Sequence, residues 1–380
     1  MRRYDVIVVG GGPAGSATAA LFAAQGRRVL VLDKARFPRA KPCAEYVSPG
    51  GVAILARLGA LERIEATGKR RWLRGMQITA PAGTSHLVGY HDAHGRELRG
   101  LAVSRLVLDA ALLETARASG AGVREGFRVR DIYHTDGRVA GVIGPSGERV
   151  EADLLVGADG LQSVVAHRLR LRRRVHWPRR LGLVTHYAGV NWPEEYGRML
   201  VSHSGYAGVA PLDDDGLVTV GLVCPMPRKR HCWPGSALEA ALASYPDLSG
   251  RLSGGEQAAA VTGIGPLARR VERTAGPGFA LVGDAAGFFD PFTGEGIFRA
   301  LRGAELLAAC PERYVRAREK AFGPKQRLVA LIQLFVQVPP LMDFAIERLR
   351  GRTAVARELG NVLGDLQPAR PGLIWRLLGP

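Results

Sequence analysis

Apolar and small-residue segments alternate at the N-terminus in the order expected for a strand, a helix and a second strand. Residues 4–9 are an apolar, β-branched run bounded by glycines, which predicts a buried parallel strand. Residues 13–26 are rich in alanine and end at a glycine, which predicts a helix. Residues 28–33 are apolar again and predict the second strand. Together these segments predict a βαβ unit.

Further along the chain, the pattern predicts a second sheet and a helical C-terminal region. Strands are expected near residues 122–142, at 152–156 and, alternating with turns, from about 181 to 223, with hairpin residues at Asp136-Gly137 and Ser146-Gly147. Helices are expected over residues 104–119, 236–250 and 297–309, and residues 312–380 are expected to be helical and interrupted at Pro339-Pro340.

These elements predict an α/β fold in which a Rossmann-like domain is interrupted by an antiparallel or mixed β-sheet domain. The expected boundaries are residues 1–74, 101–168 and 272–324 for the discontinuous nucleotide-binding domain, 75–100 and 169–271 for the inserted substrate domain, and 325–380 for the helical C-terminal region.

Arginine dominates the charge of the chain. The net charge is +17, and 46 of the 52 basic residues are arginine. Seven arginines and no acidic residue lie between Arg168 and Arg180. Such a stretch suits an anionic membrane, a phosphorylated ligand or nucleic acid, or it is a solvated face. No nucleic-acid-binding motif accompanies it, so we expect no nucleic-acid partner.

Cysteine usage and hydropathy indicate a cytoplasmic protein without a metal site. Cys43, Cys224, Cys232 and Cys310 have neither metal-ligand nor disulfide-scaffold spacing. Asp5 and the following glycines interrupt the N-terminal apolar run, so we do not expect a signal peptide. The most apolar later stretch, Leu328 to Met342, is 15 residues long and too short to cross a bilayer. A peripheral membrane contact remains open.

The first glycine motif is Gly10-x-Gly12-x-x-Gly15, between the first predicted strand and helix. Gly10 allows a tight turn, Gly12 allows backbone N–H groups to approach a pyrophosphate, and Gly15 allows close packing of helix on strand. Asp33 ends the second strand, where an acidic side chain accepts hydrogen bonds from a ribose. The motif therefore predicts a dinucleotide site.

A second glycine-rich segment runs from Leu281 to Gly296. Its apolar start predicts a buried strand, and Asp284 follows where its carboxylate could accept a hydrogen bond from a ribityl hydroxyl. The helix that begins near Gly296 would direct its N-terminus at the electron-rich edge of a flavin.

With these residues, the chain resembles the flavoprotein monooxygenase superfamily built on the p-hydroxybenzoate hydroxylase fold, and within it the geranylgeranyl reductases. Five segments match in order: the N-terminal motif, residues 37–43, 103–109 and 157–163, and the segment from Gly283 to Gly296. They fall between residues 4 and 301. The resemblance implies that the cofactor is FAD.

The resemblance also implies which residues contact the cofactor. Arg105 would lie beside the FAD phosphates or adenosine, and Asp159 would lie between FAD and transiently bound NAD(P)H. The full set of expected cofactor contacts is Gly10, Gly12, Pro13, Ala14, Gly15, Asp33, Lys34, Arg39, Cys43, Arg105, Asp159, Gly283, Asp284, Pro291, Gly294, Glu295, Gly296 and Ile297. Ser163 is expected to cap the helix after Asp159.

The reaction is less defined by the motifs. The chain has Ala44 where the reductases have glycine, and Gly208 and Ala210 where they have tryptophan and phenylalanine, which predicts a differently shaped substrate cavity. The signature of flavin halogenases is missing. We expect a lipophilic substrate, either an unsaturated isoprenoid or a quinone-like molecule that is reduced, with Cys43 and Tyr206 as candidate catalytic residues.

Two other functions remain open. One is a monooxygenase that hydroxylates an aromatic or polyketide-like substrate on the same flavin site. The other is a basic, flavin-bound protein that only binds at a membrane. No second complete GxGxxG motif is present, so electrons would come from transiently bound NAD(P)H or from a separate reductase.

Overall fold

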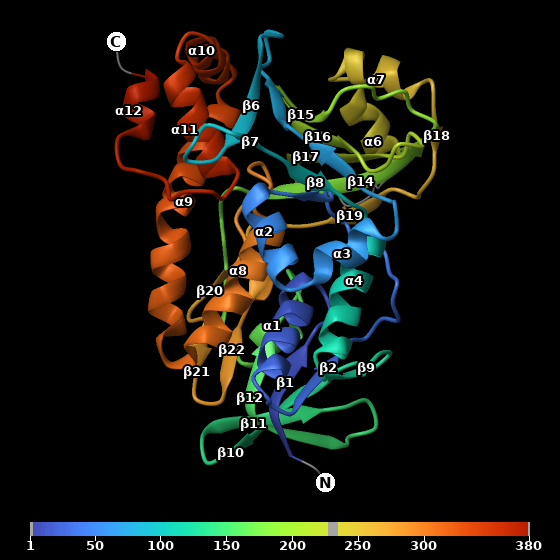
Figure 1. Ribbon diagram of the computed structural model, residues 1–380, viewed down its shortest axis with the longest axis vertical. Coiled ribbons are helices and arrows are strands. Elements are labelled where there is room, and N and C mark those ends of the chain that lie inside the picture. The colour runs from blue at the N-terminus through green and yellow to red at the C-terminus, as the bar shows by residue number, and fades with distance from the viewer. Residues whose placement is uncertain (1–2, 227–234, 379–380) are drawn as a thin grey trace.

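Two β-sheets, one above the other in Figure 1, form the body of the protein, and a column of C-terminal helices runs along one side of them. The computed structural model describes residues 3–226 and 235–378. Cys232 lies outside these residues. The predicted α/β fold is confirmed.

The lower sheet contains five parallel strands. β1 (Tyr4–Val9) lies in the middle of the sheet. It pairs with β2 (Val29–Leu32) on one side and with β12 (Arg149–Gly157) on the other. β9 (Gly122–Arg124) extends the sheet beyond β2, and β22 (Phe279–Leu281) extends it beyond β12. β22 thus lies beside β12 although more than 100 residues separate the two strands in the sequence.

A hairpin completes this sheet. β10 (Asp131–Thr135) and β11 (Arg138–Ile143) are antiparallel, and β11 pairs with the first residues of β12. Asp136 and Gly137, with φ of 50° and 73°, form the turn between them. Both are in the left-handed region that a two-residue hairpin turn requires, so the predicted hairpin at this position is confirmed.

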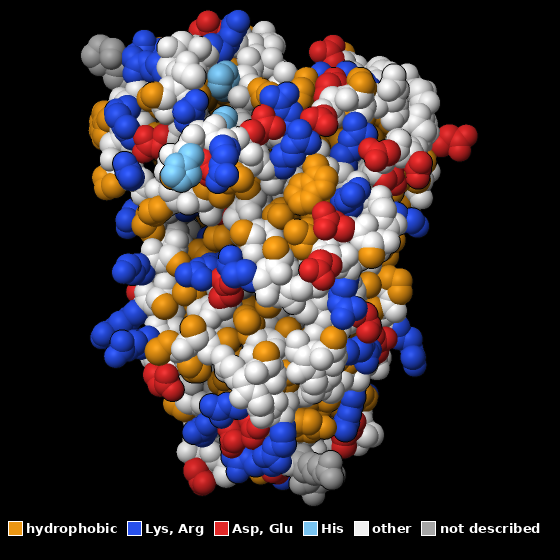
Figure 2. All heavy atoms as spheres, viewed as in Figure 1, with side chains coloured by type: hydrophobic (Ala, Val, Ile, Leu, Met, Phe, Trp, Pro, Cys, Tyr) orange, Lys and Arg blue, Asp and Glu red, His pale blue; other side chains and the backbone are white. Residues whose placement is uncertain are grey.

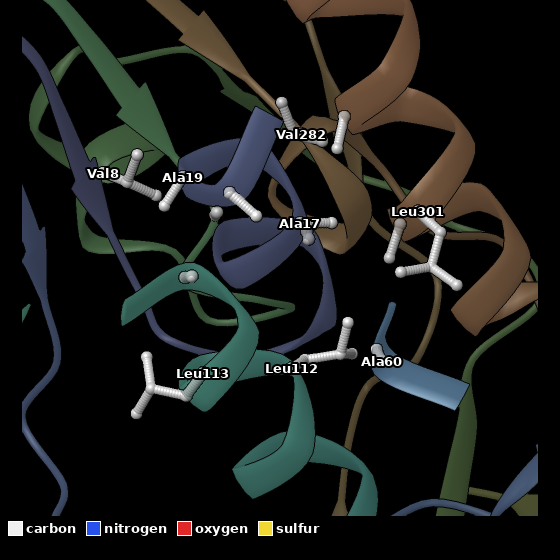
Figure 3. Close-up of a cluster of buried hydrophobic side chains, with 14 of the residues drawn as sticks. Val8, Ala17, Ala19, Ala60, Leu112, Leu113, Val282 and Leu301 are labelled. Atoms are coloured by element: carbon white, nitrogen blue, oxygen red, sulfur yellow. The ribbon is translucent and has the colours of Figure 1, made fainter. Parts of the chain in front are cut away.

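Small side chains let three helices pack closely on one face of the lower sheet. These are α1 (Pro13–Ala24), α4 (Arg105–Ala118) and α8 (Gly296–Ala309). Figure 3 shows Ala17 and Ala19 of α1 between Val8, Leu112 and Leu301. Because alanines line α1, the helices on both of its sides can approach it. The same cluster includes residues of α2 (Pro49–Arg57) and α3 (Ala60–Glu65).

The upper sheet has nine strands and is largely antiparallel. Its central strands are β14 (Arg180–Ala188), β17 (Val218–Pro225), β16 (Gly205–Pro211) and β15 (Tyr196–Ser202), in that order. β15 then pairs in parallel with β5 (Gly75–Thr79), which leads to β6 (Ser85–His91) and β7 (Glu97–Leu98). β18 (Glu256–Gln257) and β19 (Thr262–Ile264) pair with β14 at the other edge.

Further short strands form two small sheets and extend the lower sheet. β3 (Tyr46–Val47), β8 (Gly100–Ala102) and β4 (Arg71–Leu73) form a three-stranded sheet. β13 (Arg172–Arg173) pairs with β20 (Arg270–Val271), and β21 (Ala275–Gly276) pairs with β22. The short helix α5 (Val164–Arg168) follows β12, and Ser163 Oγ accepts a hydrogen bond from Ala166 N, which confirms the predicted cap.

The prediction of one helix over residues 236–250 is wrong. Two helices are present, α6 (Gly235–Leu242) and α7 (Pro246–Leu252), and they cover one face of the upper sheet. Pro246 has no N–H to donate and disfavours helical geometry in the residue before it, so the first helix ends and the second begins with proline at its first position.

The C-terminal region is helical, as predicted. It consists of α9 (Tyr314–Gln337), α10 (Pro339–Arg350), α11 (Thr353–Leu363) and α12 (Leu373–Leu378). Two short 3₁₀ helices come earlier in the chain: η1 (Gly283–Ala286) before α8, and η2 (Pro311–Arg313) directly before α9. Within the described ranges, no single helix is long and apolar enough to cross a membrane. Residues 311–337 and 339–350 reach that length and apolar content only when taken together, and a bend of 115° separates them.

Leu301 provides a test of this packing. It lies on α8 and is fully buried against α1. Leu301→Ala is expected to lower the free energy of unfolding by about 2–5 kcal/mol, because the cavity it leaves cannot fully collapse. The control is Leu106→Ala on α4, where Leu106 is 46% exposed, and its effect should stay within about 0.5 kcal/mol. Urea unfolding followed by circular dichroism measures both, and equal effects would contradict this account.

Candidate functional site

The first glycine motif forms an open turn between β1 and α1. Gly10 has a φ of 105°, which glycine adopts without strain, and a β-carbon there would lie 2.5 Å from the carbonyl oxygen of Ala158. A β-carbon at Gly15 would lie 1.7 Å from the carbonyl oxygen of Gly10. At Gly12 the nearest atom would be 3.4 Å away, on Arg39. Space is therefore present at Gly12 alone among these three.

Two arginines lie beside this space. The guanidinium groups of Arg39 and Arg105 are the nearest groups to a β-carbon placed on Gly12. Asp109, which is fully buried, holds both: it contacts Arg105 Nε at 2.7 Å and Arg39 Nη1 at 2.9 Å. Two cations against one carboxylate leave a positive excess next to the helix N-terminus, which suits a pyrophosphate.

Burial acts to lower the pKa of Arg105, but the Asp109 carboxylate beside it acts in the opposite direction, and the pKa is raised. The guanidinium therefore stays charged in the protein interior. The sequence motif that contains Arg105 also contains Asp109 four residues later, on the same helix face. This spacing is the signal by which Asp109 could have been found from the sequence.

Asp33, the acidic residue expected to bind a ribose, lies at the end of the second strand, as predicted. Asp33 is buried directly after β2; its Oδ2 accepts from Gly11 N at 2.7 Å and its Oδ1 from Ala35 N at 2.8 Å. These bonds orient the carboxylate beside the glycine turn, and each oxygen keeps a second lone pair. The adjacent Lys34 is exposed.

The second glycine segment touches the first. Gly283 has a φ of 63°, and a β-carbon there would lie 2.8 Å from the β-carbon of Ala14. Pro13 and Ala14 are buried under this contact at the start of α1. Segments 268 residues apart in the sequence thus lie side by side, as a single bound dinucleotide requires.

Asp284, next in the chain, has no hydrogen-bond donor for its carboxylate among the residues that the structure covers. Burial raises its pKa, while the charges of Lys41 and Arg105 lower it. Lys41 is half-buried nearby, and burial together with the Arg39 and Arg105 charges lowers its pKa. A carboxylate and an ammonium group that have no fixed partner at this depth fit a ligand with hydroxyl and phosphate groups.

The turn before α8 leaves the helix N-terminus without a side-chain cap. Gly294 has a φ of 65° and packs on the Tyr46 ring, and its N–H donates to the carbonyl of Pro291 at 2.9 Å. Glu295 is turned away and pairs with Arg299 at 3.0 Å and with Lys325 at 3.5 Å. The first N–H groups of α8, which include those of Gly296 and Ile297, are therefore not used by a capping side chain.

Asp159 lies close to the glycine turn, but most of its hydrogen bonds are to backbone N–H groups a few residues further along the chain. Its Oδ2 accepts from Val164 N at 2.6 Å and from Val165 N at 3.3 Å, whereas its buried Oδ1 has no partner within the described part of the chain. Burial raises its pKa. One unsatisfied carboxylate oxygen remains for a ligand.

The two candidate catalytic residues occupy different surroundings. Cys43 accepts a hydrogen bond at Sγ from Glu45 N at 3.3 Å, and burial raises its pKa, so it is a neutral thiol. Tyr206 lies in a buried network: its hydroxyl donates to Asp290 Oδ1 at 2.5 Å, and its ring meets Phe292 edge-on at 5.0 Å. Burial and Asp290 raise the pKa of Tyr206 well above its ordinary value.

This network ties the turn before α8 to the upper sheet. Asp290 also pairs with Arg180 at 2.9 Å and accepts from Gln333 of α9 at 2.7 Å. Arg180 is 7% exposed, so the last residue of the arginine-rich stretch is not on a solvated face. Nothing in the local sequence pairs residues this far apart, and the network was not predicted.

A second pair was also missed. His186 Nε2 lies 2.6 Å from Glu45 Oε2, while Glu45 Oε1 accepts from Arg105 N at 2.7 Å. Glu45 is buried and has a φ of 57°, which is strained for a non-glycine residue. Because Leu181 and Leu183 of β14 pack towards α6 and α7, the alternation of the strand places His186 on the opposite face, towards the lower sheet.

An arginine-lined cavity of about 220 Å³ opens beside Asp284. Its other lining residues include Ser163, Ala285 and five arginines: Arg172, Arg173, Arg174, Arg269 and Arg270. A second cavity, of about 430 Å³, lies along β9 and includes Arg36, Arg124 and Phe127. The larger cavity is far more open and does not include Asp284, so the smaller one is of more interest for the chemistry.

Known proteins identify the cofactor. A model of the FAD-binding-domain family matches residues 3–309. A menaquinone reductase from Mycolicibacterium smegmatis is 31% identical over 99% of this chain and 96% of its own length. A digeranylgeranylglycerophospholipid reductase from Methanothrix thermoacetophila is 30% identical over 79% of this chain and 75% of its own. The flavin-dependent brominase Bmp2 has the same fold, with a TM-score of 0.83, 22% identity, and coverage of 96% and 94%.

The chain therefore belongs to this family of FAD-dependent oxidoreductases, and the resemblance to geranylgeranyl reductases is confirmed. The residues present fit FAD. The turn is open at Gly12 between two cations, the Asp284 carboxylate has no hydrogen-bond donor in the part of the chain that the structure describes, and no side chain caps the α8 N-terminus.

Gly12 and Gly15 should respond differently to the same added methyl group. Gly12→Ala is expected to fold, because its β-carbon meets nothing closer than 3.4 Å, but to lose most of its FAD because the methyl lies between the two arginines. Gly15→Ala should destabilise the protein itself, because its β-carbon overlaps the Gly10 carbonyl. The flavin-to-protein absorbance ratio and the melting temperature of the apoprotein separate these effects. A yellow, fully loaded Gly12→Ala protein would contradict this assignment.

Proposed function

We propose that this oxidoreductase reduces a quinone that carries an isoprenoid chain, or a similar unsaturated isoprenoid. The observation that carries the proposal is the match to a menaquinone reductase over 99% of the chain, which includes the C-terminal helices. We also propose that the predicted contact residues hold FAD, and that the upper sheet with the C-terminal helices forms the substrate side.

The face of the upper sheet that is turned towards the lower sheet has small residues at its centre, which suits a broad, flat substrate. Gly208 of β16 and Gly221 of β17 are register partners, and a β-carbon on either would meet nothing closer than 3.5 Å. Gly221 faces Ala44 of the Cys43 loop. Ala210 belongs to a cluster with Tyr46 and Tyr90, whose hydroxyls are 2.6 Å apart. Small residues therefore line the middle of this face of the sheet, and bulkier groups flank it.

FAD, when bound, supplies two-electron chemistry at its ring. The protein's own residues then have to orient the substrate and manage protons. Glu45 Oε2 lies 2.6 Å from Nε2 of His186 and orients the ring, which leaves Nδ1 for the substrate. Tyr206 is committed to Asp290 and keeps the turn before α8 in place. We therefore assign it a positioning role, and we assign the proton to His186.

A monooxygenase is the alternative function, because the flavin-dependent brominase Bmp2 has the same fold. Anaerobic, chemically reduced enzyme mixed with menaquinone is expected to give a product that has gained hydrogen only, as read by mass spectrometry. A product that forms only with O₂ and carries label from ¹⁸O₂ would overturn the reductase proposal. FAD-loaded enzyme without prior reduction is the control.

We further propose that NAD(P)H is the electron donor and that its phosphates enter the arginine-lined cavity. Arg173 pairs with Glu272, but Arg269 Nε is buried without a partner in residues 3–226 and 235–378. Burial and the neighbouring Arg172 lower the pKa of Arg269. Like charges gathered at a cavity are stabilised by an anion, and Asp284 connects this cavity to the flavin site.

Arg269→Gln tests the donor site. Loss of a charge-assisted hydrogen bond is expected to weaken NADPH binding to the FAD-loaded protein by about tenfold or more in a calorimetric titration. Arg149→Gln removes the same charge from an exposed position on β12 and should leave binding unchanged. If wild-type protein binds neither NADPH nor NADH, the donor is a separate reductase and this part of the proposal is wrong.

A further inference from the structure

The bend between α9 and α10 exposes a patch of large apolar side chains. Leu334, Val338, Leu341 and Phe344, here called the elbow patch, are 46%, 37%, 37% and 46% exposed. Val338 N donates to the Leu334 carbonyl and Leu341 N donates to the Val338 carbonyl, so these residues are neighbours across the bend. The axes of the two helices differ by 115°.

Other residues of the same helices form the core beneath the bend. Phe335 and Val336 of α9, and Met342 and Ile346 of α10, are buried in one cluster. A surface helix ordinarily carries polar residues on its outer side. α9 and α10 are instead apolar on both sides at the bend, which indicates that something other than water covers the outer side.

The charges around the patch indicate what that is. Arg348 lies over the Phe344 ring at 5.7 Å, Arg350 follows on the same helix and pairs with Glu347 at 3.5 Å, and the whole chain carries a net charge of +17. Trp375 on α12, which packs against α10 and α11, is 78% exposed. In Figure 2, hydrophobic and basic side chains, with a few acidic ones among them, lie together at the upper left, near the place of α12 in Figure 1. Apolar side chains among arginines match the interface of an anionic bilayer.

We propose that the elbow patch and Trp375 dock on the surface of a membrane that contains anionic phospholipid. The proposal rests on the proposed function, because a lipophilic substrate must be taken from a bilayer. The buried cluster beneath the patch also contains Tyr206 and Phe292, beside the turn that begins α8. The docking helices therefore connect the membrane surface with the substrate side of the flavin site.

Vesicle flotation with the FAD-loaded, full-length protein tests this. The protein is expected to float with phosphatidylcholine vesicles that contain phosphatidylglycerol, and binding should weaken as salt is raised. Leu341→Glu/Phe344→Glu is expected to reduce the bound fraction at least tenfold. The matched control, Leu87→Glu/Leu106→Glu, changes residues that are 38% and 46% exposed on β6 and α4, and it should bind like the wild type.

A second variant and two further measurements keep the outcomes distinct. Leu334→Glu changes the α9 side of the bend alone and should also weaken binding. Both elbow variants should keep their FAD and should turn over a short-chain quinone in detergent micelles at the wild-type rate.

Failure of the wild type to bind anionic vesicles, or elbow variants that bind like the control, would overturn the docking proposal. So would elbow variants that change only the oligomeric state, because the patch would then join two copies of the chain. No turnover of the soluble quinone by wild type, with intact vesicle binding, would instead overturn the proposed function.

Discussion

Close contact between segments far apart in the sequence is the constraint on which the rest of the structure depends. Gly10 lies against the backbone of Ala158, and Gly283 lies against Ala14, so that β1, β12 and β22 deliver their following turns to one place. Each contact is too short for a β-carbon. The seam of alanines between α1 and α8 holds these turns together from behind. The cofactor site is thus a consequence of how closely backbones can approach.

Buried charge is organised around the same place. Asp109 holds Arg39 and Arg105 next to the glycine turn, and Glu45 binds the first N–H of the α4 helix and His186 at once. A buried carboxylate that contacts two partners is costly to disturb, because removal of either partner leaves charge without compensation. These two carboxylates link the loop of Cys43 to the lower sheet and to β14 of the upper sheet.

Local motifs explain why much of this was predictable. The βαβ unit, the Asp136-Gly137 hairpin and the cap at Ser163 each follow from residues within a few positions of one another. The two glycine segments could be joined only through the resemblance to a known family. The Glu45–His186 pair and the Tyr206–Asp290 network could not be predicted, because 141 and 84 residues separate their members and no local pattern relates them.

The space around the glycines differs between the two halves of the molecule. At Gly15 and Gly283 an added methyl group would meet an atom at 1.7 and 2.8 Å, whereas at Gly208 and Gly221 the nearest atoms are 3.5 and 3.6 Å away. The first pair has no room for a β-carbon unless neighbouring atoms shift, so substitution there is expected to destabilise the protein. The second pair admits a β-carbon at ordinary contact distance. On the proposed substrate side, positions 208 and 221 are therefore the places where an alanine would change the surface while the cofactor half stays unchanged.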